Sequence, residues 1–211
     1  MSRNDVVAAL LERAGGTFAA QAGITLDDKP APLFRLLMLT DLLSAPIAAD
    51  LAIGAARELV RSGFGTPRKV ADAGWQELVD ALGRGHYRRY DESTATRLGE
   101  NARAVLDRYH GDLRELAEQA DGDRERAAEL LREFTGIGPT GAAIFLREVQ
   151  DVWAWVGPYF DERAGQGAAA VGLPRGEREL AGLAPRGRRA ELAAALVRVT
   201  LDDELAAAIR E

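Results

Sequence analysis

The sequence predicts an all-α protein, and three observations point to this class. Hydrophobic residues make up 47% of the 211 residues, which is enough for a real core. Alanine, leucine, arginine and glutamate are abundant, whereas aromatic residues are only 6% of the chain. Apolar positions recur at helical spacing, and no stretch of any length alternates in the manner of a strand. The length suits one compact domain or two small lobes.

The helices are expected in order between glycine- and proline-containing breaks. The first lies at residues 4–14, where valine and leucine recur at helical spacing. Residues 33–43 are apolar nearly all round, which predicts a buried central helix. Further helices are expected at residues 47–62, 69–82, 91–109, 113–120, 124–134, 140–149, 177–183, 188–199 and 202–210. No repeat or low-complexity segment interrupts this series.

The composition also excludes several classes of site. Cysteine is absent, which excludes disulfides, cysteine-ligated zinc and a cysteine-ligated iron–sulfur cluster. Only His86 and His110 are present, so a protein-only histidine metal site is not expected, and we expect no cofactor. No apolar run is long enough to span a membrane and the N-terminus lacks the shape of a signal peptide, so a cytoplasmic protein without membrane partners is expected.

The net charge of −6 counts against binding nucleic acid over the whole surface. A local basic face can still contact phosphate, because such contacts act over about a Debye length, roughly 8–10 Å. Two clusters are candidates for this face: Arg84, His86, Arg88 and Arg89, and Arg186, Arg188 and Arg189. The alternative for each cluster is an ordinary solvated surface.

The most informative segment is a Gly-Ile-Gly turn at residues 136–138, between two apolar helical stretches. Glycine permits positive φ and close approach of the backbone, and Ile137 can tuck under the turn. Pro139 suits the first turn of the helix that follows. Free N–H groups at a helix start form an anion site that suits a DNA phosphate. The candidate DNA-binding residues are therefore Gly136, Ile137, Gly138, Thr140 and Gly141. The alternative is an ordinary helix–turn–helix corner.

After a connection that contains Trp153 and Trp155, the chain reads Val-Gly-Pro-Tyr-Phe-Asp-Glu-Arg-Ala, with the aspartate at position 161. A helix-hairpin-helix turn followed by such an aspartate resembles the helix-hairpin-helix, Gly/Pro-rich loop, aspartate (HhH-GPD) superfamily of DNA glycosylases, endonuclease III-like but without the iron–sulfur cluster. Weaker likenesses extend from about residue 33 to residue 174. They are residues 42–45 with Asp50, residues 85–88, and residues 168–174.

This resemblance implies a bilobed helical bundle. Residues 33–131 would form one lobe, and residues 1–32 with 132–211 a second lobe that carries the hairpin and the aspartate. The cleft between the lobes would present both. It also implies cleavage of the N-glycosidic bond of a damaged or mismatched base in double-stranded DNA, by a monomeric, nucleoid-associated protein. Lyase-active members carry a lysine where this chain has Thr140, so a monofunctional glycosylase is expected.

Asp161 is the candidate catalytic residue, because a fixed carboxylate can stabilise the oxocarbenium-like sugar or activate water. The alternative is that it is simply a helix N-cap. A flipped base needs aromatic faces, for which Tyr87, Trp153 and Tyr159 are candidates, unless they are core residues. Pro46 and Ile47 are candidates for the DNA wedge, unless they only terminate a helix.

Several departures from the family keep a second hypothesis open. The acidic net charge, the missing lysine, and two glycines at positions 165 and 167 that are expected to weaken the helix after Asp161 favour a non-catalytic helix-hairpin-helix DNA-binding protein. A purely structural helical module is a third possibility.

Overall fold

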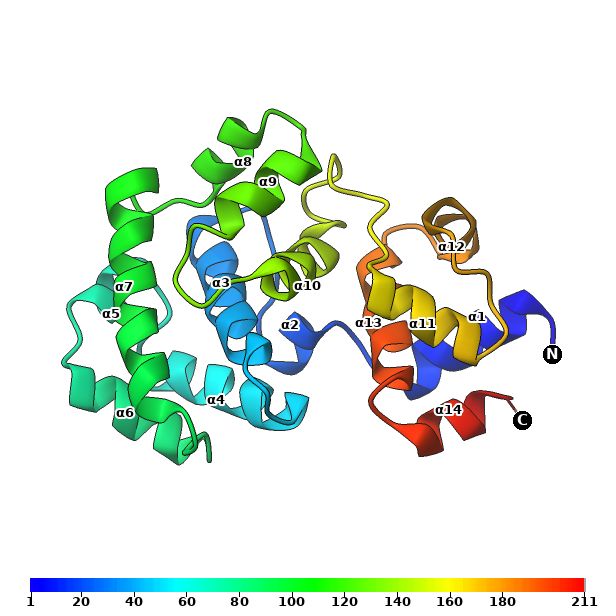
Figure 1. Ribbon diagram of the computed structural model, residues 1–211, viewed down its shortest axis with the longest axis horizontal. Helices are drawn as coiled ribbons and strands as arrows, with labels where there is room; N and C mark the ends of the chain where they lie inside the picture. The colour runs from blue at the N-terminus through cyan, green and yellow to red at the C-terminus, as the bar shows by residue number, and fades with distance from the viewer. Residues whose placement is uncertain (211) are drawn as a thin grey trace. The chain divides into compact units, whose positions relative to one another are not determined.

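The computed structural model describes residues 1–210, and over this range every regular element is helical (Figure 1), which confirms the expected fold class. The helices are α1 (Arg3–Arg13), α2 (Phe18–Gln21), α3 (Pro30–Ser44), α4 (Ala49–Arg61), α5 (Pro67–Ala71), α6 (Trp75–Arg84), α7 (Asp91–Tyr109), α8 (Arg114–Ala120), α9 (Arg124–Leu131), α10 (Pro139–Val149), α11 (Glu162–Ala170), α12 (Glu177–Leu183), α13 (Arg189–Val199) and α14 (Asp203–Arg210).

The chain divides into two compact units. One comprises residues 19–145, and the other combines residues 1–18 with the described residues from 146 onward. The boundaries of these units fall after residues 18 and 145, whereas the resemblance implies boundaries after residues 32 and 131. The hairpin turn belongs to the 19–145 unit because its own contacts tie it there. Ile137 is 3% exposed, and the ring of Phe134 lies 6.1 Å from that of Tyr109 at the end of α7.

The 19–145 unit is built around α3, which is the expected buried central helix. A proline starts it, and the run of residues 36–42 is buried without a break, because apolar side chains occupy most sides of the helix there. Helix α4 packs against α3 and α6, and α7 packs against α3, α5 and α6. Figure 1 shows α3 running through the middle of this unit beside α7.

Residues 67–84 form two helices, whereas the apolar pattern predicts a single helix at 69–82. The Thr66 hydroxyl caps α5, and Gly74 is the N-cap of α6. The Glu77 carboxylate accepts the N–H of Gly74 at 2.7 Å, which favours a fresh helix start at this position. The local cap therefore outweighs the continuous apolar pattern.

The second unit packs α11 against α13, and α1 against α12, α13 and α14. Helix α11 continues through Gly165 and Gly167, both buried, rather than being interrupted by them. A Cβ built at Gly167 would lie 1.8 Å from the carbonyl oxygen of Leu196 in α13. The glycine is therefore a packing residue that lets two helix backbones approach closely, and this contact outweighs its low helix propensity.

We expect Gly167→Ala to destabilise the fold by about 1–3 kcal/mol, because a methyl group at this position would force two helix backbones apart. Gly182→Ala in α12 is the control, since nothing lies within 4 Å of its Cβ position and alanine favours a helix. Urea unfolding of both variants gives the comparison. An equal or higher midpoint for Gly167→Ala would contradict the packing role.

Candidate nucleic-acid interface and carboxylate site

The hairpin turn offers an exposed backbone over a buried anchor. Gly138, Pro139 and Thr140 are exposed, whereas Ile137 is buried beneath them. Helix α10 begins at Pro139, and the amide of Ala142 is the first to bond back, to the carbonyl of Gly138 at 2.9 Å. The N–H groups of the first turn of a helix have no intrahelical partner, and groups of this kind can meet an anion. The anion site at this turn stays a prediction.

The glycines of this segment differ in their surroundings. Gly138 has nothing within 4 Å of its Cβ position. Gly136 has φ of +83°, and its Cβ would lie 2.6 Å from the Arg97 side chain and 3.0 Å from Asp41 Oδ1. Gly141 is buried, and its Cβ would lie 2.7 Å from the Ser44 hydroxyl. Of the three, only Gly138 has open space at its Cβ position, and the other two lie against side chains of α3 and α7.

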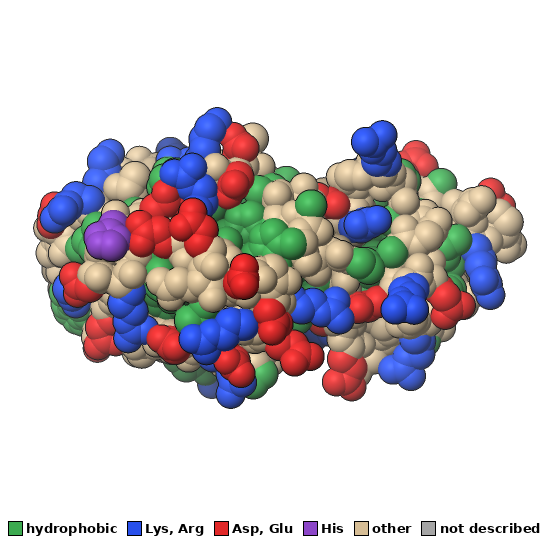
Figure 2. Space-filling view, turned by 90° about the horizontal axis from the view of Figure 1, so that it is seen from above, with side chains coloured by type: hydrophobic (Ala, Val, Ile, Leu, Met, Phe, Trp, Pro, Cys, Tyr) green, Lys and Arg blue, Asp and Glu red, His purple; other side chains and the backbone are tan. Residues whose placement is uncertain are grey.

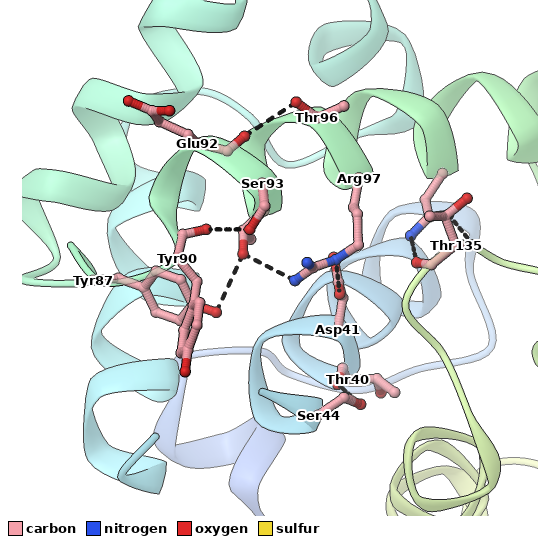
Figure 3. A network of polar contacts seen from close by, with 12 residues as sticks. Thr40, Asp41, Ser44, Tyr87, Tyr90, Glu92, Ser93, Thr96, Arg97 and Thr135 are labelled. Atoms are coloured by element: carbon pink, nitrogen blue, oxygen red, sulfur yellow. Dashed lines mark hydrogen bonds and ion pairs between the residues drawn. The ribbon is translucent and has the colours of Figure 1, made fainter. Parts of the chain in front are cut away.

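A polar network from α3 and α7 lies against this turn (Figure 3). Arg97 donates from Nε to Asp41 Oδ1 at 3.0 Å and from Nη2 to the Thr94 hydroxyl at 2.9 Å. Thr94 also shares a 3.2 Å hydrogen bond with the Tyr87 hydroxyl. The side chain of Asn101 donates to the Thr135 carbonyl at 3.0 Å and accepts the Thr135 amide at 2.9 Å.

Burial changes the proton affinity of two groups in this network. Desolvation raises the pKa of Asp41 from 3.8 to about 6, although Arg97 acts in the opposite direction. Desolvation also raises the pKa of the Tyr87 hydroxyl. Asp41 Oδ2 is buried and accepts no hydrogen bond from the described residues. Asp41 therefore carries its negative charge at an energetic cost to the fold.

The candidate wedge residues lie in the short loop between α3 and α4. Pro46 is exposed and Ile47 is half-buried. This loop follows directly after Ser44, whose hydroxyl donates to the Thr40 carbonyl at 2.7 Å. The loop thus leaves α3 at the residue that contacts Gly141.

Asp161 is the N-cap of α11 and is held on both oxygens. Its Oδ1 accepts the amide of Ala164 at 2.8 Å, and its Oδ2 accepts a hydrogen bond from Nη1 of Arg147. The side chain of Asp161 is 11% exposed and that of Arg147 is 4% exposed. Asp161 therefore caps α11, and it also forms an ion pair with the buried Arg147.

Arg147, in the last turn of α10, is the residue that sequence reasoning missed. Its Cζ lies 5.6 Å from the centre of the Phe18 ring, and Cζ of Arg198 lies 4.3 Å from the same ring. Arg147 Nε is buried without a hydrogen-bond partner in the described chain. The available signal was a charged Arg-Glu pair inside an otherwise apolar run, at residues 144–149.

The three candidate base-pocket residues are placed differently. Tyr87, in the 19–145 unit, is 2% exposed, and Trp153, in the other unit, is 3% exposed. Trp153 stacks on Trp155 at 5.7 Å between ring centres. Rings this buried have no face open to a base in this structure, so both belong to the core. Tyr159 is half-buried and stays a candidate.

The two basic clusters are partly neutralised by acidic neighbours. Arg84 pairs with Glu58 at 3.1 Å, and Arg188 pairs with Glu191 at 2.5 Å. Figure 2 shows cationic and anionic side chains intermixed on the face in view. Within residues 1–210, no three metal-binding side chains gather in one place, and no helix has the length and apolar character needed to cross a bilayer.

The comparisons with known proteins place the fold but not the family. No family model matches the sequence, and no curated protein sequence matches it. Among solved structures, the chain is similar to a trapped endonuclease III–DNA covalent intermediate, described as an estranged-adenine complex. That likeness covers 93% of this chain and 85% of the other, with a TM-score of 0.50 and 15% identity. The protein therefore has an endonuclease III-like helical fold.

Proposed function

We propose that this protein is a monofunctional DNA glycosylase that cleaves the N-glycosidic bond of a damaged or mismatched base in double-stranded DNA, with Asp161 as its catalytic carboxylate. The observation that carries the proposal is the Asp161 carboxylate, fixed at the start of α11 in a chain with an endonuclease III-like fold. An exposed hairpin turn with first-turn amides supports DNA as the partner.

Cleavage of a glycosidic bond is favoured by a carboxylate that is held in a fixed position. The glycosidic bond breaks as positive charge develops on the sugar, and a preorganised anion stabilises that charge without having to reorient. The amide of Ala164 and the guanidinium of Arg147 hold the two oxygens of Asp161 from different sides. Each oxygen keeps further lone-pair capacity for a cation or a water molecule.

The second candidate function is a DNA-binding protein without excision chemistry, and the Arg147–Asp161 pair favours it. A carboxylate already paired with a buried cation stabilises a second positive charge less strongly, because the two charges largely cancel at a distance. In this role the hairpin would bind phosphate and Asp161 would only secure the start of α11.

Excision is tested directly with a panel of duplexes that carry deaminated, oxidised, alkylated or mismatched bases. Abasic sites are scored by alkaline cleavage. Excision of any one lesion supports the glycosylase. Duplex binding in the complete absence of excision supports the binding-only alternative.

We expect the product to be an intact strand with an abasic site. A lysine amine can attack the sugar and form a Schiff base that permits β-elimination, and the threonine hydroxyl at position 140 cannot. Strand breaks should therefore need alkali. A covalent protein–DNA adduct trapped by borohydride would contradict this expectation and direct attention to Lys29 and Lys69.

We expect Gly138→Leu to weaken duplex binding at low salt without loss of stability. The new side chain has open space around it in the free protein, yet it would stand where a phosphate approaches the backbone. Gly182→Leu is the control, because that exposed glycine also has nothing within 4 Å of its Cβ position and lies outside the hairpin. Equal affinity of the two variants in fluorescence anisotropy would remove the hairpin from the binding surface.

A further inference from the structure

We propose that Asp41, Arg97 and Asn101 are positioning residues that hold the hairpin turn in its phosphate-binding shape. This inference rests on the proposed DNA binding by the hairpin and adds to it the side chains through which the turn is fixed. We call these three residues the hairpin platform. None of them lies in the turn, and none was singled out by the sequence.

Asn101 holds the entrance of the turn. Its amide group makes two hydrogen bonds with the backbone of Thr135, one to the carbonyl and one from the N–H. The side chain is 4% exposed, so water does not compete for these bonds. The residue after Thr135 is Gly136, whose φ of +83° reverses the chain into the turn.

Arg97 fills the space directly beneath Gly136. A Cβ at Gly136 would lie 2.6 Å from Cδ and Nε of Arg97, so the two groups are in close packing. The guanidinium is kept there by Asp41 at 3.0 Å and by the Thr94 hydroxyl at 2.9 Å. Figure 3 shows Arg97 and Asp41 pointing toward each other. The position of the turn thus depends on where Asp41 holds Arg97.

The charge on Asp41 is costly, which argues that it serves a purpose other than stability. Its carboxylate is 1% exposed, and only one of its two oxygens is hydrogen-bonded to the described residues. An asparagine at this position would keep an acceptor for Arg97 and avoid the buried charge. Functional sites are where proteins retain groups of this kind.

The surroundings of Asp41 contain few other charges. Helix α7 brings Arg97, and the segment before it brings Tyr87. The hairpin contributes the backbone of Gly136, and the buried face of α4, which packs against α3, is apolar. Protonation of Asp41 below pH 7 therefore weakens its pairing with Arg97, and this pairing is how pH affects the turn.

The first test measures the turn itself, by hydrogen exchange of residues 130–142 in the full-length protein. Asn101→Ala should speed exchange of the Thr135 amide about two- to tenfold, the loss expected for one hydrogen bond. Glu100→Gln is the control, since Glu100 is an exposed neighbour on the same helix. Unchanged exchange in Asn101→Ala would overturn the proposal whether or not the protein binds DNA.

The second test measures duplex affinity of wild type and Asp41→Asn between pH 5 and pH 7.5. At pH 7.5 wild type should bind severalfold more tightly, because its ionised carboxylate holds Arg97 by charge as well as by a hydrogen bond, whereas asparagine offers the hydrogen bond alone. At pH 5 Asp41 is mostly protonated, and the two proteins should bind nearly alike. The ratio cancels every effect of pH that the two proteins share. A ratio that does not change with pH would overturn the proposal, and no binding by wild type at any pH would overturn the proposed function instead.

Discussion

Asp161→Asn is expected to lower excision at least on the order of a hundredfold, as the loss of a main electrostatic stabiliser does. Asparagine keeps the size of the side chain and can still cap α11, but it lacks the negative charge that would face the developing cation on the sugar. Single-turnover excision at saturating enzyme separates this chemical step from DNA binding. Activity near that of wild type would end the catalytic role of Asp161.

The Arg147–Asp161 ion pair decides which control this experiment needs. In the Asn variant the buried guanidinium of Arg147 loses its charged partner, so some stability is lost together with any catalysis. The matched variants are Arg147→Met and the double change Asp161→Asn with Arg147→Met. Breaking a buried pair from one side costs about 3–5 kcal/mol, whereas replacing both charges costs less.

The two readings of Asp161 then give opposite results for the double variant. If the carboxylate is catalytic, excision stays at the level of Asp161→Asn even though the buried charge has gone. If Asp161 only supports the start of α11, the double variant recovers excision because its fold is relieved of the unpaired arginine. Urea unfolding of all four proteins shows that each is folded under the conditions of the excision assay.

The fold class was predictable because it depends on local patterns. The helical spacing of α1, α3 and α7 can be recognised from residues that are close in the sequence. The Gly-Ile-Gly turn needs a positive φ at Gly136, which glycine adopts readily. Asp161 could likewise be recognised as a helix cap, since a cap depends on the residues next to it.

The surroundings of these residues could not be predicted, because they come from segments far apart in the chain. The low helix propensity of glycine predicts that Gly167 weakens α11, yet its importance lies in the close approach of Leu196 from α13. The partnership of Arg147 with Asp161 joins two elements that no spacing rule connects. The apolar pattern of residues 33–43 predicts the burial of α3. It does not predict that the buried carboxylate of Asp41 forms an ion pair with Arg97 of α7.

Asp41→Asn is expected to change how the free energy of unfolding depends on pH. The pKa of Asp41 is about 6 in the folded protein and 3.8 as its ordinary value, so between these pH values the folded state binds a proton that the unfolded state lacks. The contribution of Asp41 to the free energy of unfolding therefore increases as the pH falls from 7 to 4, and it decreases as the pH rises. The full difference corresponds to about 3 kcal/mol.

The measurement is urea unfolding of wild type and Asp41→Asn at pH 4, 5, 6 and 7, with the difference between the two proteins as the readout. Wild type should gain up to about 3 kcal/mol relative to the variant on going from pH 7 to pH 4, because asparagine cannot take up the proton. Duplex affinity should move in the opposite direction over the same range, since protonation stabilises the fold while releasing Arg97 from beneath the hairpin. If wild type lost affinity merely because it unfolded, its duplex affinity and its free energy of unfolding would decrease together. A constant stability difference between pH 4 and pH 7 would show that Asp41 keeps an ordinary pKa and that its burial carries no such cost.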